Sequence, residues 1–401
     1  MQIPLSPLVK NIRPSLMFHF LEKAKDMERQ GFEIIHLEKG EPEFGPPPRV
    51  IEAAKKAMDE GHNILTPSAG IKELRDAIAE DLQIEYGLSV DPSTEVAVVP
   101  GAKFGIYAAI ASTIVPGDEV LCLSPFFPPH REIVEMLGGK FVPVPILEEG
   151  TCRLSIEKFE ERLTEKTRFL LLSYPHNPTG WVPTKDEMAL LLDLVEKKGL
   201  VVVSDEVYDK IVFDGFKHRP FFGFPNLAGQ LVLVNSYSKR FAMTGWRIGY
   251  CVGPSNIING IVRIQQNTAT CAHSVSQKAA VIALKEEKSY SEMLAKVYGE
   301  RKNLIIKKLR EIPGLEPIIS KGSLFIFLSI SKLPFTSTQF VDEFLTEEHV
   351  ALTPGVAFGE DWNQYIRISM TEEPQKIAEA LDRLERFVEK RTDVAPVVRT
   401  V

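Results

Sequence analysis

The fold is decided by the stretch Leu200-Val201-Val202-Val203-Ser204-Asp205-Glu206. Its apolar, β-branched residues predict a strand that is buried on both faces and ends at two carboxylates. Similar short apolar runs lie along the chain, and each ends at polar or glycine residues: 96–99, 120–123, 169–173 and 231–235. Helical patterns alternate with them. This alternation predicts an α/β fold whose large domain has a mostly parallel central sheet.

The 401-residue chain is too long for one typical domain, and its pattern changes near residue 290. A polar helix is predicted over 291–310, strands over 324–328 and 365–369, and an amphipathic helix over 376–389. We therefore expect a large domain over 49–290 and a smaller α+β domain over 291–401, against which an N-terminal segment, 1–48, packs. The tail from Arg391 has no pattern, and we expect it to be mobile.

Composition argues against several classes of partner. A net charge of −7 and dispersed basic residues give no reason to expect nucleic acid or an anionic membrane surface. No apolar run is long enough to span a membrane, and the proline-broken N-terminus is not a signal peptide. The four cysteines form no C-x-x-C pair, which disfavours a metal site or a disulfide framework. We expect a cytoplasmic protein with reduced thiols.

Polar residues gather where the predicted strands end. Ligands of open α/β sheets bind beyond the carboxyl ends of the strands. The strand ends would bring Lys103, Asn177, Asp205 and the turn from Ser236 to Lys239 to one edge of the sheet. This convergence predicts a ligand site there.

Lys239 is the candidate reactive amine of that site. A lysine forms a Schiff base only when part of it is deprotonated, and an unperturbed lysine titrates near ~10.4. Nearby positive charge and partial burial lower that value. Ser236, Ser238 and Arg247 are suited to bind the phosphate of an aldehyde cofactor beside this amine. The alternative is a basic surface turn, which an isolated S-x-S-K sequence indicates equally well.

Further candidates each have a structural alternative. Asp205 would be a buried charge unless it met a cation, and otherwise it could cap a helix. Tyr208, three residues further on, could share its ligand. Ala102 and Lys103 open a helix after Gly101, where free backbone N–H groups bind phosphate, although a plain strand-to-helix turn is the commoner interpretation of a glycine-rich step.

Three more side chains complete the set. Asn177 lies in an Asn-Pro-Thr-Gly turn, which by itself indicates only a turn. Phe127 could lie against a ring-shaped ligand or belong to the core. Arg367 points opposite its apolar neighbours on a predicted strand, where arginine is usually solvated; the alternative is a fork for a carboxylate.

Taken together, the motifs identify a resemblance. From about residue 15 to residue 388 the chain resembles the fold-type I pyridoxal-phosphate enzymes of the class I/II aminotransferase family. The motifs that carry the resemblance, in chain order, are Gly40-Glu41-Pro42, Gly101-Ala102-Lys103, Tyr174-Pro175-His176-Asn177-Pro178-Thr179-Gly180, Asp205-Glu206-Val207-Tyr208, Ser236-x-Ser238-Lys239, Gly245-Trp246-Arg247-Ile248-Gly249-Tyr250, Pro354-Gly355, Phe358-Gly359 and Arg367.

The resemblance implies roles around a pyridoxal 5'-phosphate. Lys239 would form the imine with the cofactor and move the proton between the substrate α-carbon and C4′. Asp205 would pair with the pyridinium nitrogen, and Asn177 and Tyr208 would bond the phenolic oxygen. Phe127 would stack on the ring.

The remaining implied roles concern the two anionic groups. The phosphate would be held by Ala102, Lys103, Ser236, Ser238 and Arg247. The substrate α-carboxylate would be held by Arg367, Asn177 and the backbone of Gly40. The resemblance also implies a homodimer with active sites at the interface.

The chain departs from the family at several positions. Leu65 stands where relatives commonly carry a tyrosine that reaches the partner subunit's phosphate, so Asn63, Thr66 or Arg247 would have to compensate. His130 replaces a frequent tyrosine near the ring edge. The apolar entry segment 16–19 leaves an apolar or aromatic substrate as open as a dicarboxylate. His273 is expected at the surface.

These features predict an aminotransferase that moves the α-amino group of an amino acid to a 2-oxo acid in two half-reactions. One alternative is another pyridoxal-phosphate reaction on an amino acid: β- or γ-elimination or substitution, oxidase-type chemistry or cyclisation. A second alternative is a regulatory binding protein on the same scaffold. Such regulators carry an added DNA-binding module, which we do not expect because Ser15 already lies in the enzyme-like region.

Overall fold

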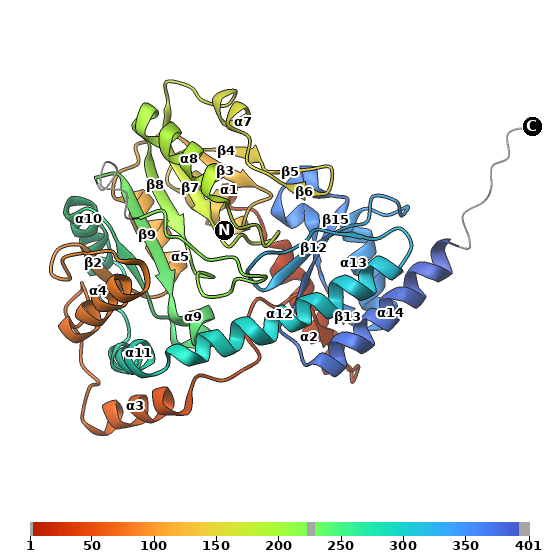
Figure 1. Ribbon diagram of the computed structural model, residues 1–401, viewed down its shortest axis with the longest axis horizontal. Helices are drawn as coiled ribbons and strands as arrows, with labels where there is room; N and C mark the ends of the chain where they lie inside the picture. The colour runs from red at the N-terminus through yellow and green to blue at the C-terminus, as the bar shows by residue number, and fades with distance from the viewer. Residues whose placement is uncertain (1–2, 223–228, 393–401) are drawn as a thin grey trace, which may run out of the picture.

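A computed structural model describes residues 3–222 and 229–392 (Figure 1). Within these residues the central element is a seven-stranded sheet of order β2-β10-β9-β8-β7-β3-β4. Only β10 is antiparallel to its neighbours, so the predicted α/β class with a mostly parallel sheet is confirmed. Its strands are β2 (Val96–Val99), β3 (Glu119–Ser124), β4 (Lys140–Pro145), β7 (Thr167–Ser173), β8 (Val201–Asp205), β9 (Leu231–Ser236) and β10 (Gly249–Val252).

Both faces of this sheet are buried under helices. Ala97 and Val99 pack on one face, and Val96 and Val98, which alternate with them, pack on the other. The first face is covered by α5 (Ala102–Ala111), α6 (Pro128–Met136) and α10 (Ser255–Gln266). The second is covered by α3 (Pro48–Asp59), α4 (Lys72–Tyr86), α7 (Ile156–Glu160), α8 (Lys185–Lys198) and α11 (Ser274–Glu286). Burial on both faces explains the near-continuous apolar runs of the strands.

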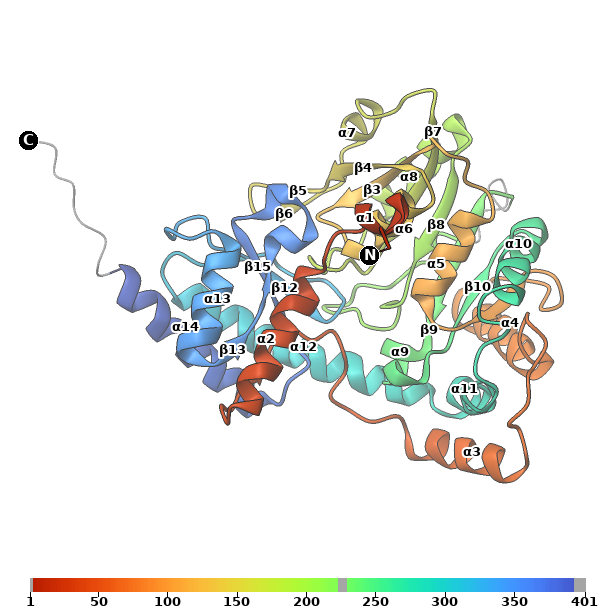
Figure 2. The same cartoon turned by 180° about the vertical axis from the view of Figure 1, so that it is seen from behind.

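A second, four-stranded sheet of order β11-β12-β15-β14 lies beside the first (Figure 2). Its strands are β11 (Glu316–Pro317), β12 (Phe325–Ser329), β14 (Thr353–Pro354) and β15 (Tyr365–Ser369). Helices α2 (Leu16–Arg29), α12 (Lys288–Glu311), α13 (Ser337–Glu348) and α14 (Pro374–Thr392) pack around it. The N-terminal β1 (Ile35–His36) pairs in parallel with β13 (Val350–Ala351), so the start of the chain joins this second core.

Short elements complete the fold. They are α1 (Pro7–Asn11), β5 (Leu147–Glu148), β6 (Thr151–Cys152), α9 (Tyr237–Arg240) and the 3₁₀ helices η2 (Thr244–Trp246), η3 (Gly355–Phe358) and η4 (Glu360–Trp362). Helix α9 matters most for the site, because it follows β9 without a loop and carries Lys239.

One predicted helix is shifted relative to the structure. The small, apolar residues over 106–114 predict a helix there, and this range is wrong at both ends because α5 covers Ala102–Ala111, although the expected opening at Ala102 and Lys103 is confirmed. Gly101 adopts a positive φ of 87°, and the helix begins directly after it. Ala102 and Lys103 therefore lie in the first helical turn, where backbone N–H groups have no intrahelical partner.

The C-terminal tail was expected to be mobile, and residues 393–401 of it lie outside the described residues. No helix within residues 3–222 and 229–392 is long and apolar enough to cross a membrane.

Candidate functional site

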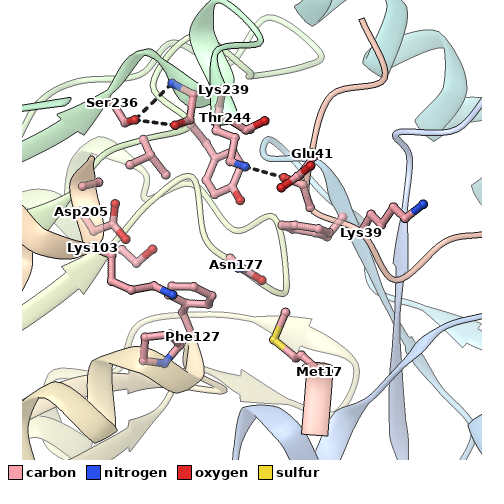
Figure 3. Close-up of a pocket in the computed structure, with 18 of the residues that line it drawn as sticks. Met17, Lys39, Glu41, Lys103, Phe127, Asn177, Asp205, Ser236, Lys239 and Thr244 are labelled. Carbon is pink, nitrogen blue, oxygen red and sulfur yellow. Dashed lines mark hydrogen bonds between the residues drawn. The ribbon is translucent and has the colours of Figure 1, made fainter. Parts of the chain in front are cut away.

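A cavity of about 590 Å³ lies where the strand ends of the large sheet meet the small sheet and α2 (Figure 3). All of the predicted site residues line this one cavity: Gly40, Ala102, Lys103, Phe127, Asn177, Asp205, Tyr208, Ser236, Ser238, Lys239, Arg247 and Arg367. The convergence expected from the strand ends is therefore present in the structure. The groups that each residue can bind depend on its free hydrogen-bonding atoms and its charge.

Lys239 enters the cavity from the short helix α9 and donates a hydrogen bond to the backbone oxygen of Gly40. Burial lowers the pKa of Lys239 to about 8, and the positive charges of Arg367 and Arg247 act in the same direction. Glu41 and Asp205 oppose this shift but do not cancel it. The amine is therefore far more often neutral near pH 7 than an ordinary lysine.

Asp205 ends strand β8 and is only 6% exposed. One carboxylate oxygen, Oδ2, lies 3.3 Å from Nε2 of His130, and Oδ1 has no hydrogen-bond partner among the described residues. We expected Asp205 to meet a cation, and the structure places a histidine there. A buried carboxylate oxygen without a partner is costly, so Oδ1 is suited to a ligand N–H group.

An anion-binding corner is formed by the first turn of α5 together with the β9–α9 turn. The hydroxyl of Ser236 accepts from the backbone N–H of Ser238 and lies 2.9 Å from its hydroxyl. The Arg247 guanidinium stands so close to Gly101 that a Cβ at position 101 would collide with it. Partial burial and the charge of Arg247 lower the pKa of Lys103. Free N–H groups, hydroxyls and two cations meet at this corner, an arrangement typical of phosphate sites.

Arg367 is completely buried, so the usual interpretation of a solvated strand arginine was wrong. It donates to Asn177 Oδ1 at 3.1 Å, to the Glu38 backbone oxygen at 2.7 Å and to Thr353 Oγ1 at 3.2 Å. Phe325 stacks on the guanidinium, with the ring centroid 4.0 Å from Cζ. Burial lowers the pKa of Arg367 to about 10, which still leaves it protonated at neutral pH.

The positive charge of Arg367 has no ion-pair partner within the described part of the chain. Three of its five N–H groups donate to neutral oxygens, and Nε has no hydrogen-bond partner there. A buried guanidinium of this kind is expensive unless an anion joins it. The side of the cavity near Arg367 is therefore suited to a carboxylate ligand.

Aromatic and apolar side chains line the rest of the cavity. Phe127 is half-buried, not part of the core, and Lys103 Nζ lies 5.9 Å from its ring centroid. Tyr208 is buried against Phe325, with ring centroids 5.9 Å apart, and burial raises the pKa of its hydroxyl. Met17 projects into the cavity from α2, opposite the sheet residues (Figure 3).

Leu65, the two nearby polar residues that could compensate for it, and His273 do not line this cavity. Leu65 is 73% exposed and lies away from this cavity, as does its exposed neighbour Ile64. Thr66 accepts a hydrogen bond from Gln277, and Asn63 donates to the backbone of Met58. His273 is exposed and caps α11, which agrees with the expected surface position.

Sequence reasoning missed several lining residues. Glu38, Glu41 and Thr244 belong to the cavity, and His130 was not recognised as the neighbour of Asp205. Adjacency to the Gly40 motif was the available signal for Glu38 and Glu41. For His130 the resemblance indicated a position near the ring edge, but its contact with Asp205 had no local signal, because 75 residues separate the two.

Comparisons with known proteins agree with this geometry. The profile of the family described as aminotransferase class I and II matches residues 33–384. The chain is 36% identical over 389 residues to aromatic-amino-acid aminotransferase 2 of Thermococcus litoralis, covering 96% of this chain and 99% of the relative. It is 37% identical to an aspartate aminotransferase of Pyrococcus abyssi, covering 95% and 97% of the two chains.

Solved structures give the same result. The aromatic aminotransferase from Pyrococcus horikoshii OT3 superposes with a TM-score of 0.88 at 38% identity, covering 92% of this chain and 100% of that one. The aspartate aminotransferase from Rhizobium meliloti superposes with a TM-score of 0.92 at 31% identity, covering 97% and 100%.

Proposed function

This chain belongs to the aminotransferase class I and II family, and we infer from its cavity how it performs amino-group transfer. Enzymes of this family use pyridoxal 5'-phosphate, so the protein is a pyridoxal-phosphate-dependent aminotransferase acting on an amino acid and a 2-oxo acid. When bound, the cofactor supplies an electron sink for negative charge at the substrate α-carbon. One observation supports the site assignment: a carboxylate oxygen and a guanidinium that lack a counterpart within residues 3–222 and 229–392 line one cavity together with an amine of lowered pKa.

We propose that Asp205 and Phe127 would hold the ring of the cofactor. We propose that the free oxygen of Asp205 accepts from the pyridinium N–H and keeps that nitrogen protonated, because a nearby negative charge favours the cationic form. Asn177 and Tyr208 would donate to the phenolic oxygen. Phe127 would lie on the ring face.

The phosphate fits the anion-binding corner. We assign it to the N–H groups of Ala102 and Lys103, the hydroxyls of Ser236 and Ser238, and the guanidinium of Arg247. Arg247 contributes two parallel donors and a full charge, whereas Leu65 contributes no hydrogen bond. In this chain we propose that Arg247 and the backbone supply what the missing tyrosine supplies in relatives.

Lys239 and Arg367 act on the substrate. We propose that Nζ of Lys239, with its lowered pKa, would accept the proton from the substrate α-carbon and pass it to C4′ of the cofactor within the same half-reaction. Arg367 and Asn177 bind the α-carboxylate, and the backbone of Gly40 faces it. Holding this carboxylate orients the Cα–H bond toward Nζ, which lowers the entropic part of the barrier.

The wall opposite the sheet indicates the preferred side chain. Met17, Phe18 and Leu21 of α2 line the cavity together with Phe127 and Ile106. Burying an apolar substrate side chain against this wall lowers the free energy of the bound state. We propose that large apolar or aromatic amino acids are the better substrates, and kcat/KM for phenylalanine and leucine should exceed that for aspartate. The reverse order would contradict the proposal.

Domain boundaries and assembly are also proposals. We propose a cofactor-binding domain over 49–290 and a smaller domain over 291–401 that includes the packed segment 1–48, because β1 pairs with β13. We propose a homodimer whose active sites lie at the interface, supported by the exposed apolar pair Ile64 and Leu65. Four free cysteines favour a reducing, cytoplasmic location.

One experiment tests the reaction. Purified protein loaded with cofactor is mixed with a panel of amino acids in the absence of any 2-oxo acid, and the long-wavelength absorbance of the bound cofactor is followed. Transamination should remove this absorbance stoichiometrically, and adding a 2-oxo acid should restore it. Continuous turnover without an acceptor would instead identify a lyase or an oxidase.

A matched pair of variants tests the site. Lys239→Ala should abolish the absorbance change with every amino acid, because no amine remains to move the proton. Lys198→Ala, on the exposed face of α8, should behave as the wild type. Full activity of the Lys239→Ala variant would overturn the assignment of Lys239.

A further inference from the structure

Three titratable side chains form a row that leads from the surface to the buried Arg367. Glu28 of α2 is half-exposed, and its Oε1 lies 3.1 Å from Nε2 of His36. Nδ1 of His36 lies 2.7 Å from Oε1 of Glu38. Both His36 and Glu38 are buried, and the second carboxylate oxygen of Glu38 has no hydrogen-bond partner among the described residues.

Glu38 is linked to Arg367 in two ways. Its backbone oxygen accepts the shortest of the three hydrogen bonds that Arg367 donates, at 2.7 Å. Glu38 lines the same cavity, and the negative charge of its carboxylate favours the protonated form of Arg367. The position of Glu38 therefore affects where the Arg367 guanidinium lies, and its charge affects the protonation of that group.

The segment that carries Glu38 is held by its backbone and by His36. Leu37 donates to Ala351 and accepts from Ser369, so the chain runs as an extra strand beside β13 and the end of β15. The His36–Glu38 hydrogen bond adds a side-chain anchor immediately before the cavity. Loss of that anchor would free the Glu38 carboxylate to approach Arg367.

The charged groups that face His36 come from two elements. Glu38 and Lys39 belong to its own segment, and Glu28 projects from α2. Lys25, also on α2, acts on Glu28. Strand β13 places Ala351 opposite His36, and His349, which precedes β13, packs its ring on Phe32. Helix α14 contributes buried apolar residues to the core around β1, among them Ile377 and Leu381.

The two carboxylates outweigh burial, so the pKa of His36 is raised above its ordinary value of 6.5. Below this pKa the row Glu28–His36–Glu38 carries two negative charges and one positive charge, a net −1. Above it the net charge is −2. As the pH rises through the pKa of His36, the cavity wall beside Arg367 therefore becomes more negative by one charge.

We propose that Glu38, held by His36, is a positioning residue for Arg367 that sets how strongly the site binds the substrate carboxylate. The proposal rests on the carboxylate-binding role assigned to Arg367 above. While His36 is protonated, the Glu38 charge is compensated and Arg367 is available to the substrate. When His36 loses its proton, uncompensated Glu38 competes with the substrate for Arg367, and the KM rises.

The test compares KM and kcat for one amino acid between about pH 5.5 and 8.5, a range that brackets the histidine. For Glu38→Gln the KM at high pH should fall several-fold, up to about tenfold, because one buried negative charge is removed. For His36→Gln the KM should be high at every pH. Changes in kcat should be smaller in both. Glu33→Gln, an exposed glutamate just before β1, is the matched control and should follow the wild type.

A readout independent of the cofactor is the imidazole resonance of His36 in the cofactor-free protein. It should titrate above pH 6.5, and Glu38→Gln should lower its midpoint. Lys239, with a pKa of about 8, also titrates in this range and affects the KM of every variant. The effect of His36 is therefore taken from the difference in KM between wild type and Glu38→Gln and from the His36 resonance. If Glu38→Gln does not fold, Glu28→Gln at the exposed end should shift the midpoint of the KM change to lower pH.

Two outcomes separate the possible failures. If Arg367→Gln leaves KM unchanged, the proposed carboxylate site itself is wrong. If Arg367→Gln raises KM but a folded Glu38→Gln variant follows the wild type at every pH, Arg367 keeps its role and the inference about Glu38 is overturned. An unchanged His36 midpoint in Glu38→Gln would overturn it equally.

Discussion

Lys239 owes its reactivity to its surroundings. With a pKa of about 8, roughly a tenth of the amine is neutral at pH 7, against well under a thousandth for an ordinary lysine. Burial on α9 is the main cause, and Arg367 and Arg247 add to it. The site therefore prepares the amine before any ligand arrives.

The lowered pKa of Lys239 predicts how its acylation rate depends on pH. In the cofactor-free protein, acylation of Lys239 should accelerate with rising pH with a midpoint near 8, because only the neutral amine reacts and its folded pKa is lowered. Peptide mapping by mass spectrometry measures the rate for each lysine. The exposed Lys198 serves as the internal reference for labelling and digestion. A rate for Lys239 that does not rise between about pH 7 and 9 would contradict the assigned environment.

Arg367 provides a second test at this scale. Arg367→Lys keeps the positive charge but loses the planar fork and the bonds to Asn177 and Thr353. A lost hydrogen bond to a charged group costs about 1.5–3 kcal/mol, so KM should rise by roughly ten- to a hundredfold. Steady-state kinetics with one amino acid measure it. A KM within twofold of the wild type would contradict a carboxylate role.

What the sequence could predict about the site follows from local pattern. Asp205 and Lys239 follow strands directly, and parallel strands deliver their ends to one edge, so their convergence in one cavity was predictable. The contact of His130 with Asp205 spans 75 residues, and that of Glu38 with Arg367 spans 329. No local pattern encodes such pairs. The complete burial of Arg367 depends on them too.

At the scale of elements, α9 is the critical piece, since it is only four residues long. A helix this short has too few hydrogen bonds to be stable by itself. Behind Lys239, Arg240 makes a bidentate pair with Asp81 of α4 at 2.6 and 3.0 Å, and both residues are buried. This pair fixes α9, and with it the amine, to the large sheet's helical layer.

The pair can be tested by stability. Asp81→Asn leaves the buried Arg240 without its counter-charge, so the free energy of unfolding should fall by about 3–5 kcal/mol. Urea denaturation measures it. Asp76→Asn on the same helix removes an exposed i,i+4 pair with Lys72 and should cost no more than about 0.5 kcal/mol. Similar losses of unfolding free energy in the two variants would show that the buried Arg240–Asp81 pair stabilises the protein no more than an exposed pair does.

The bounds of helices and strands were predictable where the sequence marks their ends, and they were less predictable where proline or long-range pairing decides them. Strands 96–99 and 365–369 agree with β2 and β15, and Gly87, a residue type that favours helix ends, ends α4 in the left-handed conformation. Strand β4 was missed because Pro143 and Pro145 disguise it, and the structure places it at the sheet edge, where proline is tolerated. Strand β10 was read as part of a motif, because only the fold shows it pairing with β2 and β9.

At the scale of the whole molecule, the exposed pair Ile64 and Leu65 bears on assembly. They are 75% and 73% exposed on an irregular loop, and two adjacent apolar side chains in water are typical of an interface. In the proposed homodimer a second copy would cover them. The loop would then lie close to the partner's cofactor site.

Leu65→Asp should therefore weaken the dimer, because burying an unpaired carboxylate at the interface is unfavourable. Sedimentation velocity at decreasing protein concentration measures the dissociation. Ile84→Asp, on an apolar residue of α4 that is 62% exposed, is the matched control and should leave the dimer intact. If both variants remain dimers at every concentration, the loop is not part of the interface.

The long helix α12 has one more consequence. At its start Lys288 contacts Asp81 and Glu85 of the large sheet's helices, while Leu294 to Leu309 pack in the small sheet's core. Its 24 residues extend over about 36 Å, so a tilt of roughly ten degrees would displace the far end by about 6 Å. Such a tilt about the Lys288 contacts would move the small sheet, which carries Arg367, relative to α9, which carries Lys239. The distance between these two side chains would therefore depend on the angle of one helix.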